Sequence, residues 1–187
     1  MRIDLFDFDL PERLIALRPL AERDGSRMLV VRPSGIQDAQ FRDLSSILSP
    51  KDIVVVNNTR VVPVALSGHR PGRGDAAPAV SIDVTLIRRL RENRWSALAK
   101  PARRLSVGDR IQFAPTVWAR VDRVAGAGEI ELAFETGERP LEQVLPKIGK
   151  MPLPPYILKH READARDGSD YQTVFAAHEG ALAAPTA

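Results

Sequence analysis

The hydrophobic and polar positions of the first sixty residues alternate between strand-like and helix-like spacing. Five elements are predicted there: an extended stretch over 5–9, a helix over 12–17 opened by Pro11, a strand over 28–31, a helix over 44–48 capped by Asp43, and a strand over 53–56. The last is a continuous apolar run, which is typical of a strand buried on both faces of an α/β sheet. This part of the sequence therefore indicates an α/β domain.

The pattern from residue 61 to residue 134 is that of short strands separated by turns that carry Gly, Pro and Asp. The predicted strands cover 61–67, 80–90, 94–100, 110–114, 117–124 and 129–134. About six short strands at intervals of roughly 10–15 residues favour a small antiparallel barrel or sandwich.

Helical spacing returns after Pro140, because apolar residues recur at i, i+3, i+4 and i+7 from Leu141 to Ile148. Gly149 ends this predicted helix, and the proline-rich segment 151–157 predicts a stiff extended crossing. We therefore expect an α/β fold, an incomplete barrel-like domain interrupted by an inserted antiparallel β-barrel. The expected domains are a catalytic one over 1–62 and 150–187, and an insert over 63–149.

The sequence ends in a run of small residues that includes Pro185 and Thr186. Small residues and proline give a backbone that leaves room for a ligand against it. We expect this run to form one part of a site whose other half is missing.

Composition excludes several classes of protein. The 187 residues hold no cysteine, which removes disulfide scaffolds, thiol catalysis and cysteine-based zinc sites. No apolar run approaches the roughly 18–20 residues that cross a bilayer, and the first residues do not form a secretory signal. The three histidines are far apart, and no nucleotide-binding glycine motif occurs. We therefore expect a cytoplasmic protein with no metal site.

Basic residues are concentrated in the middle of the chain. Between residues 88 and 104 there are seven Lys or Arg residues and one acid, with Trp95 among them. Basic side chains with an aromatic nearby suit contact with an RNA backbone. The candidates for this contact are Arg88, Arg89, Arg103 and Arg104. The same pattern is consistent with charged turns around a core tryptophan.

Three polar groups are candidates for a binding site. Asp7 and Asp9 share one face of the predicted extended stretch, where they would hold a cationic ligand or form the polar side of an edge strand. Arg60 follows the predicted buried strand, so it would bind a carboxylate or phosphate, or lie on the surface beside an Asx turn. Residues 171–173 are polar and would read a base by hydrogen bonds or belong to a turn.

Several segments together resemble the S-adenosylmethionine:tRNA ribosyltransferase-isomerase family of queuosine biosynthesis. In order, they are Asp7-Phe8-Asp9-Leu10-Pro11, residues 57–63, Lys100-Pro101, Gly108-Asp109, Met151-Pro152-Leu153-Pro154-Pro155-Tyr156-Ile157, Tyr171-Gln172-Thr173-Val174-Phe175-Ala176 and Ala183-Ala184-Pro185-Thr186-Ala187. The resemblance is collinear along the chain. It departs at Ala65, where the family motif carries Arg, and at the end, where the family continues into a further half of the α/β domain.

The resemblance implies an enzyme that transfers and isomerises the ribosyl moiety of S-adenosylmethionine onto 7-aminomethyl-7-deazaguanine at the tRNA wobble position, giving epoxyqueuosine. S-adenosylmethionine is then a substrate, tRNA is the partner, and no cofactor, metal or membrane is involved. It implies substrate binding by Asp7, Asp9, Arg60, Tyr171, Gln172, Thr173, Pro185 and Thr186, and it identifies no general base. We expect a monomer. The alternative is a non-enzymatic RNA-binding fragment that is inactive without the C-terminal half.

Overall fold

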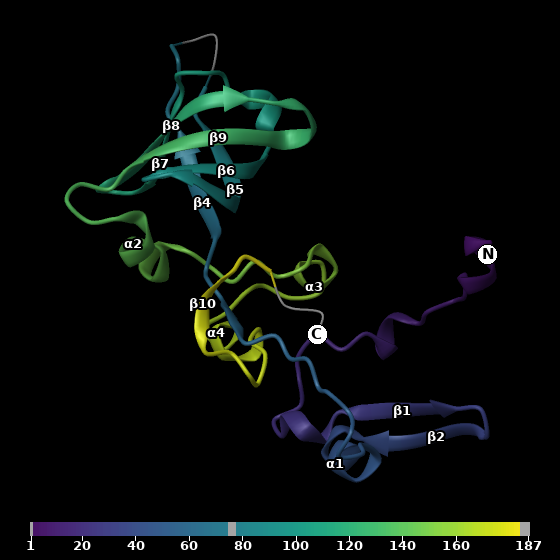
Figure 1. Cartoon of the computed structure of the whole chain (residues 1–187). Helices are drawn as coiled ribbons and strands as arrows, with labels where there is room; N and C mark the ends of the chain where they lie inside the picture. Colours follow the sequence, from purple (N-terminus) through teal and green to yellow (C-terminus); the bar gives the residue numbers. More distant parts are fainter. Residues whose placement is uncertain (1, 75–77, 184–187) are drawn as a thin grey trace. The chain divides into compact units, whose positions relative to one another are not determined.

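The computed structural model describes residues 2–74 and 78–183, and the chain divides into two compact units (Figure 1). Unit 1 consists of Met1–Val55 and Tyr156–Glu162. Unit 2 consists of Val56–Pro155 and Ala163–Ala187. Each unit is described by itself below.

Unit 1 contains one antiparallel strand pair and several single helical turns. Strand β1 (Arg27–Arg32) pairs with β2 (Gly35–Gln40), and Gly35 takes a φ of 140° at the turn between them. The strand predicted over 28–31 is therefore confirmed. The helical elements are η1 (Ile3–Phe6), η2 (Glu12–Leu14), η3 (Arg23–Gly25), η4 (Phe41–Asp43), α1 (Leu44–Ile47) and, beginning at the last residue of unit 2, α3 (Pro155–Leu158).

Two predictions for unit 1 are wrong in secondary structure. Residues 5–9 do not form a strand, because the chain turns in η1 and both Phe6 and Phe8 remain exposed. The run Ile53–Val56 is not a buried strand either, since Ile53 is 89% and Val55 83% exposed. An apolar run indicates residues whose burial would be favourable. A strand also needs a neighbouring strand that pairs with its backbone N–H and C=O groups. No strand in the described part of the chain pairs with this run.

Two further predictions differ in detail. The helix expected over 12–17 is only the single 3-10 turn η2, which is consistent with the high cost of nucleating a short helix. Asp43 does precede helix α1, but its carboxylate does not cap that helix. It accepts instead a 2.8 Å hydrogen bond from the backbone N–H of Gln40, and so closes a capping box around η4.

Unit 2 is built around a closed six-stranded antiparallel barrel (Figure 1). Its strands are β4 (Ala65–Arg70), β5 (Val80–Arg91), β6 (Arg94–Lys100), β7 (Arg110–Ala114), β8 (Val117–Val124) and β9 (Glu129–Glu135). The order around the barrel is β4-β5-β6-β9-β8-β7, and the β4–β7 pair closes it. The short turns η5 (Ala102–Arg104) and η6 (Gly126–Gly128) connect strands. Strands β5 to β9 agree with the predicted ones to within one residue, whereas β4 overlaps the strand predicted over 61–67 only in part.

Period-two alternation explains why these segments form a barrel with a filled interior. The inward side chains are almost completely buried, including Leu66, Ile82, Leu86, Ile130 and Leu132. Alternate residues along each strand face outward and are mostly polar, which is the pattern that a barrel requires.

The barrel closes where β4 meets β7, at a glycine. A Cβ at Gly68 would lie 2.7 Å from the backbone oxygen of Gln112, so the two strands approach too closely there for a side chain.

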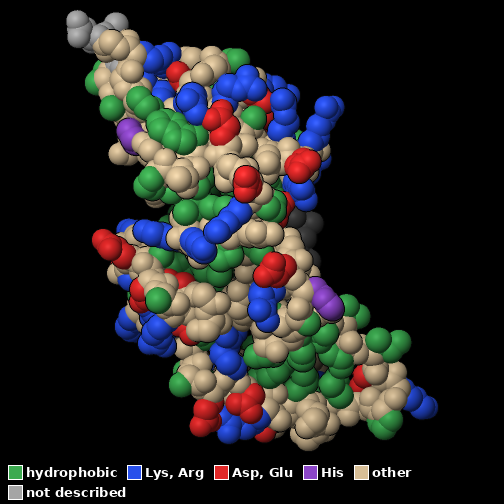
Figure 2. All heavy atoms as spheres, turned by 90° about the vertical axis from the view of Figure 1, so that its left-hand side faces the viewer, with side chains coloured by type: hydrophobic (Ala, Val, Ile, Leu, Met, Phe, Trp, Pro, Cys, Tyr) green, Lys and Arg blue, Asp and Glu red, His purple; other side chains and the backbone are tan. Residues whose placement is uncertain are grey.

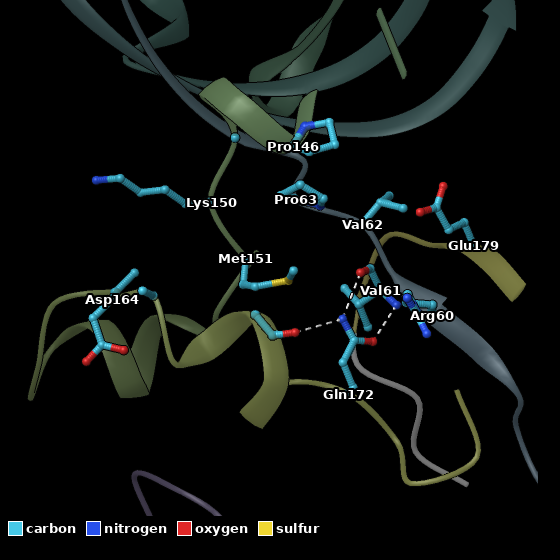
Figure 3. A pocket seen from close by; sticks show the side chains of 14 residues that line it. Arg60, Val61, Val62, Pro63, Pro146, Lys150, Met151, Asp164, Gln172 and Glu179 are labelled. Carbon is cyan, nitrogen blue, oxygen red and sulfur yellow. Dashed lines mark hydrogen bonds between the residues drawn. The ribbon is translucent and has the colours of Figure 1, made fainter. Parts of the chain in front are cut away.

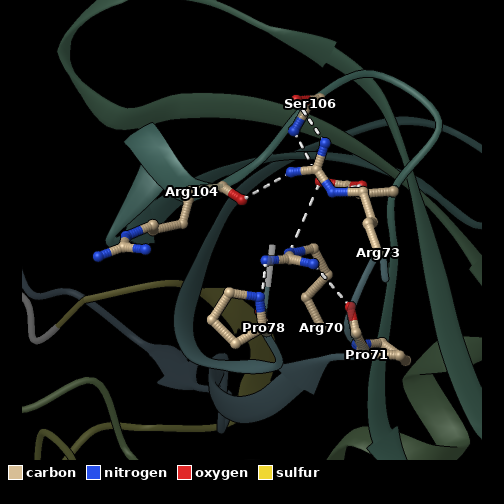
Figure 4. A network of polar contacts seen from close by, with 7 residues as sticks. Arg70, Pro71, Arg73, Pro78, Arg104 and Ser106 are labelled. Atoms are coloured by element: carbon tan, nitrogen blue, oxygen red, sulfur yellow. Dashed lines mark hydrogen bonds and ion pairs between the residues drawn. The ribbon is translucent and has the colours of Figure 1, made fainter. Parts of the chain in front are cut away.

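One end of the barrel holds a buried network of charged groups (Figure 4). Arg70 is 3% exposed, donates to the backbone oxygens of Pro71 and Pro78, and lies 3.9 Å from the carboxylate of Asp109. Arg73 lies 3.2 Å from the same carboxylate. Asp109 also accepts a hydrogen bond from the backbone N–H of Ser106. The network joins the loop after β4 to the loop before β7.

The rest of unit 2 is mixed in type. Helix α2 (Leu141–Ile148), which was predicted, adds Leu141 and Leu145 to the barrel core and ends at Gly149. The segment 151–154 belongs to no helix or strand and contains a turn closed by a 2.8 Å hydrogen bond from the Leu153 N–H to the Met151 oxygen, and α3 begins at Pro155. The stiff extended crossing predicted over 151–157 is therefore not continuous.

Strand β3 (Thr59–Val61) pairs in parallel with β10 (His178–Ala181), and the short helix α4 (Asp167–Asp170) precedes β10. The single strand predicted over 61–67 is therefore two strands, β3 and β4, which lie on either side of Pro63 and belong to different sheets. The expected fold class, mixed α/β with an antiparallel β-barrel, is confirmed.

Candidate functional site

A pocket of about 540 Å³ lies in unit 2 beside the parallel strand pair (Figure 3). We call it the Arg60 pocket. Its lining comes from β3 and the linker to β4, from α2 and the residues just after it, from α4 with the loop before it and the residues just after it, and from β10. The lining residues are Arg60, Val61, Val62, Pro63, Pro146, Gly149, Lys150, Met151, Ala163, Asp164, Ala165, Gly168, Gln172 and Glu179.

Local sequence explains how Arg60 reaches this pocket. The side-chain oxygen of Asn57 accepts a 2.9 Å hydrogen bond from the backbone N–H of Thr59, which forms an Asx turn and starts β3. Parallel pairing then places Glu179 of β10 beside Arg60. Arg60 is thus an exposed residue beside an Asx turn, as one interpretation of the sequence expected, and it also lines a pocket. Binding of a carboxylate or phosphate by Arg60 stays a prediction.

The amide of Gln172 holds the free side of β3. Its oxygen accepts a 2.8 Å hydrogen bond from the backbone N–H of Val61, and its nitrogen donates to the backbone oxygen of the same residue at 2.9 Å. The nitrogen also lies 3.3 Å from the backbone oxygen of Gly168 (Figure 3). A side-chain amide therefore pairs with β3 as a neighbouring strand would, and it anchors α4 to the strand that carries Arg60.

The end of α2 forms a second wall of the Arg60 pocket. Lys150 and Ala65 exchange two backbone hydrogen bonds of 2.8 and 3.1 Å, so the chain after α2 runs antiparallel to the start of β4. Gly149 precedes this bridge, and a Cβ there would lie 1.9 Å from the backbone oxygen of Pro63. Only glycine allows the two walls to approach this closely.

The remaining wall is a loop that a buried carboxylate organises. Asp167 is 1% exposed and accepts a 2.8 Å hydrogen bond from the backbone N–H of Asp164. Asp164 itself is exposed and lines the pocket.

The lining carries charges of both signs. Arg60 and Lys150 are cationic, and Asp164 and Glu179 are anionic. In Figure 3, Arg60 and Glu179 lie on one side of the pocket and Asp164 on the other. A ligand that carries both a carboxylate and a cationic group would find a counter-charge for each.

A second pocket, of about 640 Å³, adjoins the first, and we call it the Trp95 pocket. The two pockets share Val62, Pro63, Pro146 and Glu179. The other residues that line the second pocket come from β5, β6, α2 and the end of β10: Ile87, Arg88, Arg89, Trp95, Glu142, Leu145, Gly180 and Leu182.

The structure brings together some of the predicted substrate-binding residues. Arg60 and Gln172 line the same pocket, whereas Tyr171 and Thr173 are half-buried and line neither pocket in the described part of the chain. Asp7 and Asp9 belong to unit 1, where both are exposed.

Two substrate-binding candidates lie outside the described residues. These are Pro185 and Thr186.

The predicted RNA-contacting arginines are all exposed on the barrel. Arg88 and Arg89 lie on β5 at the Trp95 pocket, and Arg89 is 3.2 Å from Glu142 of α2. Arg103 and Arg104 lie on η5. Figure 2 shows Lys and Arg side chains spread over the barrel, at the upper end of the view, with Asp and Glu among them.

Sequence reasoning missed three charged residues of the Arg60 pocket: Lys150, Asp164 and Glu179. Each is an exposed charged residue in a loop or edge strand, and nothing in its local sequence distinguishes it from other surface charges. The nearest sequence feature to any of the three is the proline-rich segment 151–157, which begins directly after Lys150.

Within residues 2–74 and 78–183, no three or more His, Asp or Glu side chains gather as metal ligands would. Among the same residues, no helix has the length and apolar character needed to cross a membrane.

Comparison with known proteins gives a consistent result. The family model described as queuosine biosynthesis protein matches residues 3–187. Proteins called S-adenosylmethionine:tRNA ribosyltransferase-isomerase from Nitrobacter winogradskyi and Rhizobium meliloti are 51% and 48% identical to the chain. Each alignment covers 100% of this chain and 54% of the relative, so the chain spans about half the length of the curated relatives it matches.

A solved structure is also similar. The crystal structure of S-adenosylmethionine tRNA ribosyltransferase from Thermotoga maritima is 26% identical, with a TM-score of 0.37. The match covers 82% of this chain and 52% of that one.

Proposed function

The chain belongs to the queuosine biosynthesis protein family, and we propose that it carries substrate-binding parts of an S-adenosylmethionine:tRNA ribosyltransferase-isomerase. The reaction moves the ribosyl moiety of S-adenosylmethionine onto 7-aminomethyl-7-deazaguanine in tRNA and isomerises it, which gives epoxyqueuosine. The enzyme's substrates would be S-adenosylmethionine and tRNA. In the domain arrangement that we propose, residues 1–62 and 150–187 belong to the catalytic domain and residues 63–149 form the insert.

The observation that carries this proposal is the mixed charge of the Arg60 pocket. S-adenosylmethionine carries a carboxylate, an ammonium and a sulfonium group. Arg60 offers a planar pair of N–H donors that matches a carboxylate, and Lys150 adds a second cation. Asp164 and Glu179, which line the same pocket, would balance the ammonium and the sulfonium. We therefore assign the donor to this pocket.

The positive sulfonium acidifies the neighbouring ribosyl carbon, so a base must remove that proton and the departing adenine must be stabilised. The hydrogen bonds from Gln172 to Val61 fix the strand that carries Arg60. Gln172 would then act by positioning, while Asp7, Asp9, Tyr171 and Thr173 stay predicted substrate contacts.

The tRNA would approach the barrel. Arg88, Arg89, Arg103 and Arg104 are exposed there, and neutralising phosphates with arginines makes binding weaken as salt rises. The expected site of contact thus adjoins the proposed donor pocket, since Arg88 and Arg89 lie at the pocket that shares a wall with it.

The test is release of adenine from S-adenosylmethionine in the presence of tRNA that carries the 7-deazaguanine precursor. We expect Arg60→Ala to lower tRNA-dependent release by about tenfold or more, the equivalent of about 1.4 kcal/mol. The matched control is Arg123→Ala, because Arg123 is an exposed arginine of β8 that lines neither pocket.

Equal losses in Arg60→Ala and Arg123→Ala would contradict the assignment of the donor to the Arg60 pocket. Retention of tRNA without any adenine release would instead support a fragment that binds RNA without catalysis.

A further inference from the structure

The Trp95 pocket has an apolar floor, of which Trp95 forms part. Trp95 is 7% exposed, and its indole N–H is buried without a hydrogen-bond partner among the described residues. Val62, Ile87, Leu145 and Leu182 supply apolar surface around it. The pocket therefore offers a ligand an apolar surface with an aromatic residue in it.

The rim of this pocket carries two arginines that differ in their partners. Arg89 is held by the carboxylate of Glu142 at 3.2 Å. Arg88 is exposed and makes no ion pair within the described part of the chain. One guanidinium at the rim is therefore available for an anion, and the neighbouring one is already committed.

The position of the pocket narrows the choice of ligand. Its wall of Val62, Pro63, Pro146 and Glu179 is also a wall of the Arg60 pocket, so ligands in the two pockets would lie next to each other. A two-substrate transfer needs its substrates in this relation. An aromatic and apolar floor beside a free arginine suits an unstacked nucleobase and its phosphate.

We propose that the Trp95 pocket receives the tRNA base that accepts the ribosyl group, with Arg88 binding the phosphate next to it. This inference rests on the proposed function. It divides the two substrates between adjoining pockets: the donor lies in the Arg60 pocket and the base in the Trp95 pocket. A base must leave its stack to enter such a pocket, as enzymes that modify bases commonly require.

The protein contains its own reporter for this pocket. Its two tryptophans are Trp95 and Trp118, and Trp118 lies on β8 against Arg110, outside the pocket. In the Trp118→Phe variant Trp95 is the only source of tryptophan emission. We expect its fluorescence to change when an anticodon stem-loop RNA is titrated in, and to stay constant when S-adenosylmethionine is added alone.

Matched substitutions test the contacts. Arg88→Ala should weaken RNA binding by about tenfold, and Arg91→Ala on the same strand, outside both pockets, should weaken it by about threefold or less. Ile87→Glu, which adds a negative charge inside the pocket, should abolish the Trp95 response. Leu98→Glu, at a similarly exposed apolar position on β6, should leave that response intact.

The outcomes separate this inference from the proposed function. RNA binding that leaves Trp95 emission unchanged overturns the base pocket and leaves the RNA face standing. A change in Trp95 emission caused by S-adenosylmethionine alone reverses the division of the substrates. Equal effects of Arg88→Ala and Arg91→Ala show that charge acts without the pocket, which also overturns the inference. A chain that binds no RNA at all contradicts both proposals.

Discussion

Replacing Gln172 by alanine tests whether one side chain holds the strand of the Arg60 pocket. The substitution removes the acceptor of the Val61 N–H and the donor to the Val61 oxygen, and it also removes the 3.3 Å contact with Gly168. Val61 is 2% exposed, so water does not readily replace these partners. The backbone N–H of Val61 would be left buried and unpaired.

The expected cost follows from these contacts. A hydrogen bond contributes about 0.5–1.5 kcal/mol net, and a buried donor left unpaired costs about 1–3 kcal/mol. We therefore expect local opening at β3 to become easier by about 2 kcal/mol. Since 1.4 kcal/mol corresponds to tenfold, exchange of the Val61 amide hydrogen should become faster by about 30-fold.

The assay is hydrogen exchange followed at the Val61 amide, with a barrel amide such as that of Ile82 as the internal reference. The control is Gln143→Ala, which changes an exposed glutamine of α2 and should leave the exchange of Val61 unaltered. Exchange of Val61 that is equally fast in wild type and Gln172→Ala would refute the reasoning. A change of the same size at Ile82 would mean that the whole unit had been destabilised.

Three further outcomes follow from contacts described above. Gly149→Ala should lower the free energy of unfolding by about 3 kcal/mol or more in urea, because its Cβ would lie 1.9 Å from the Pro63 oxygen; an unchanged midpoint would contradict this. Asp109→Asn should cost about 3–5 kcal/mol in the same assay, since a buried arginine loses its counter-charge. The pKa of Glu12 is lowered, chiefly by a hydrogen bond from Lys159, so this pair stabilises the fold above the ordinary glutamate pKa and ceases to as pH falls through the lowered value. Lys159→Ala should raise the pKa of Glu12 in an NMR titration, and no rise would contradict the pairing.

The barrel was predictable because its strands are specified locally. Alternation with period two marks which residues face inward, and segments that carry Gly, Pro and Asp separate the strands, so sequence pattern and chain order together define the architecture. The exception is the strand predicted over 61–67, where β3 and β4 belong to different sheets on either side of Pro63. A continuous β-like pattern does not reveal that a chain leaves one sheet and enters another.

The elements of unit 1 were less predictable because they depend on partners. The alternation over 5–9 and the apolar run Ile53–Val56 indicate which residues favour burial, yet neither run pairs with a strand in the described part of the chain. Sequence periodicity carries no information about the partner. Helix α2 illustrates the opposite case, since its apolar face, Pro140 and Gly149 all agree locally and the barrel core receives it.

The site was predictable only in part. Arg60 was found because it lies in the 57–63 motif and follows the apolar run 53–56, although that run is not a strand and Arg60 lies within β3. Gln172 was found because it lies in a distinctive polar cluster. Lys150, Asp164 and Glu179 were missed, because charged residues from three distant segments meet only once the chain has folded. The role of Gln172 was also not evident: the sequence predicts a polar contact with substrate, and the structure commits its amide to the backbone of Val61.

The central claim, that the Arg60 pocket holds the donor, is tested most directly by calorimetric titration of the chain with S-adenosylmethionine. The account predicts that Arg60→Ala weakens binding by about tenfold or more, the equivalent of about 1.4 kcal/mol. It predicts that Arg88→Ala, in the adjoining pocket, changes binding by less than about twofold. Loss of binding in Arg88→Ala with full binding in Arg60→Ala would contradict it.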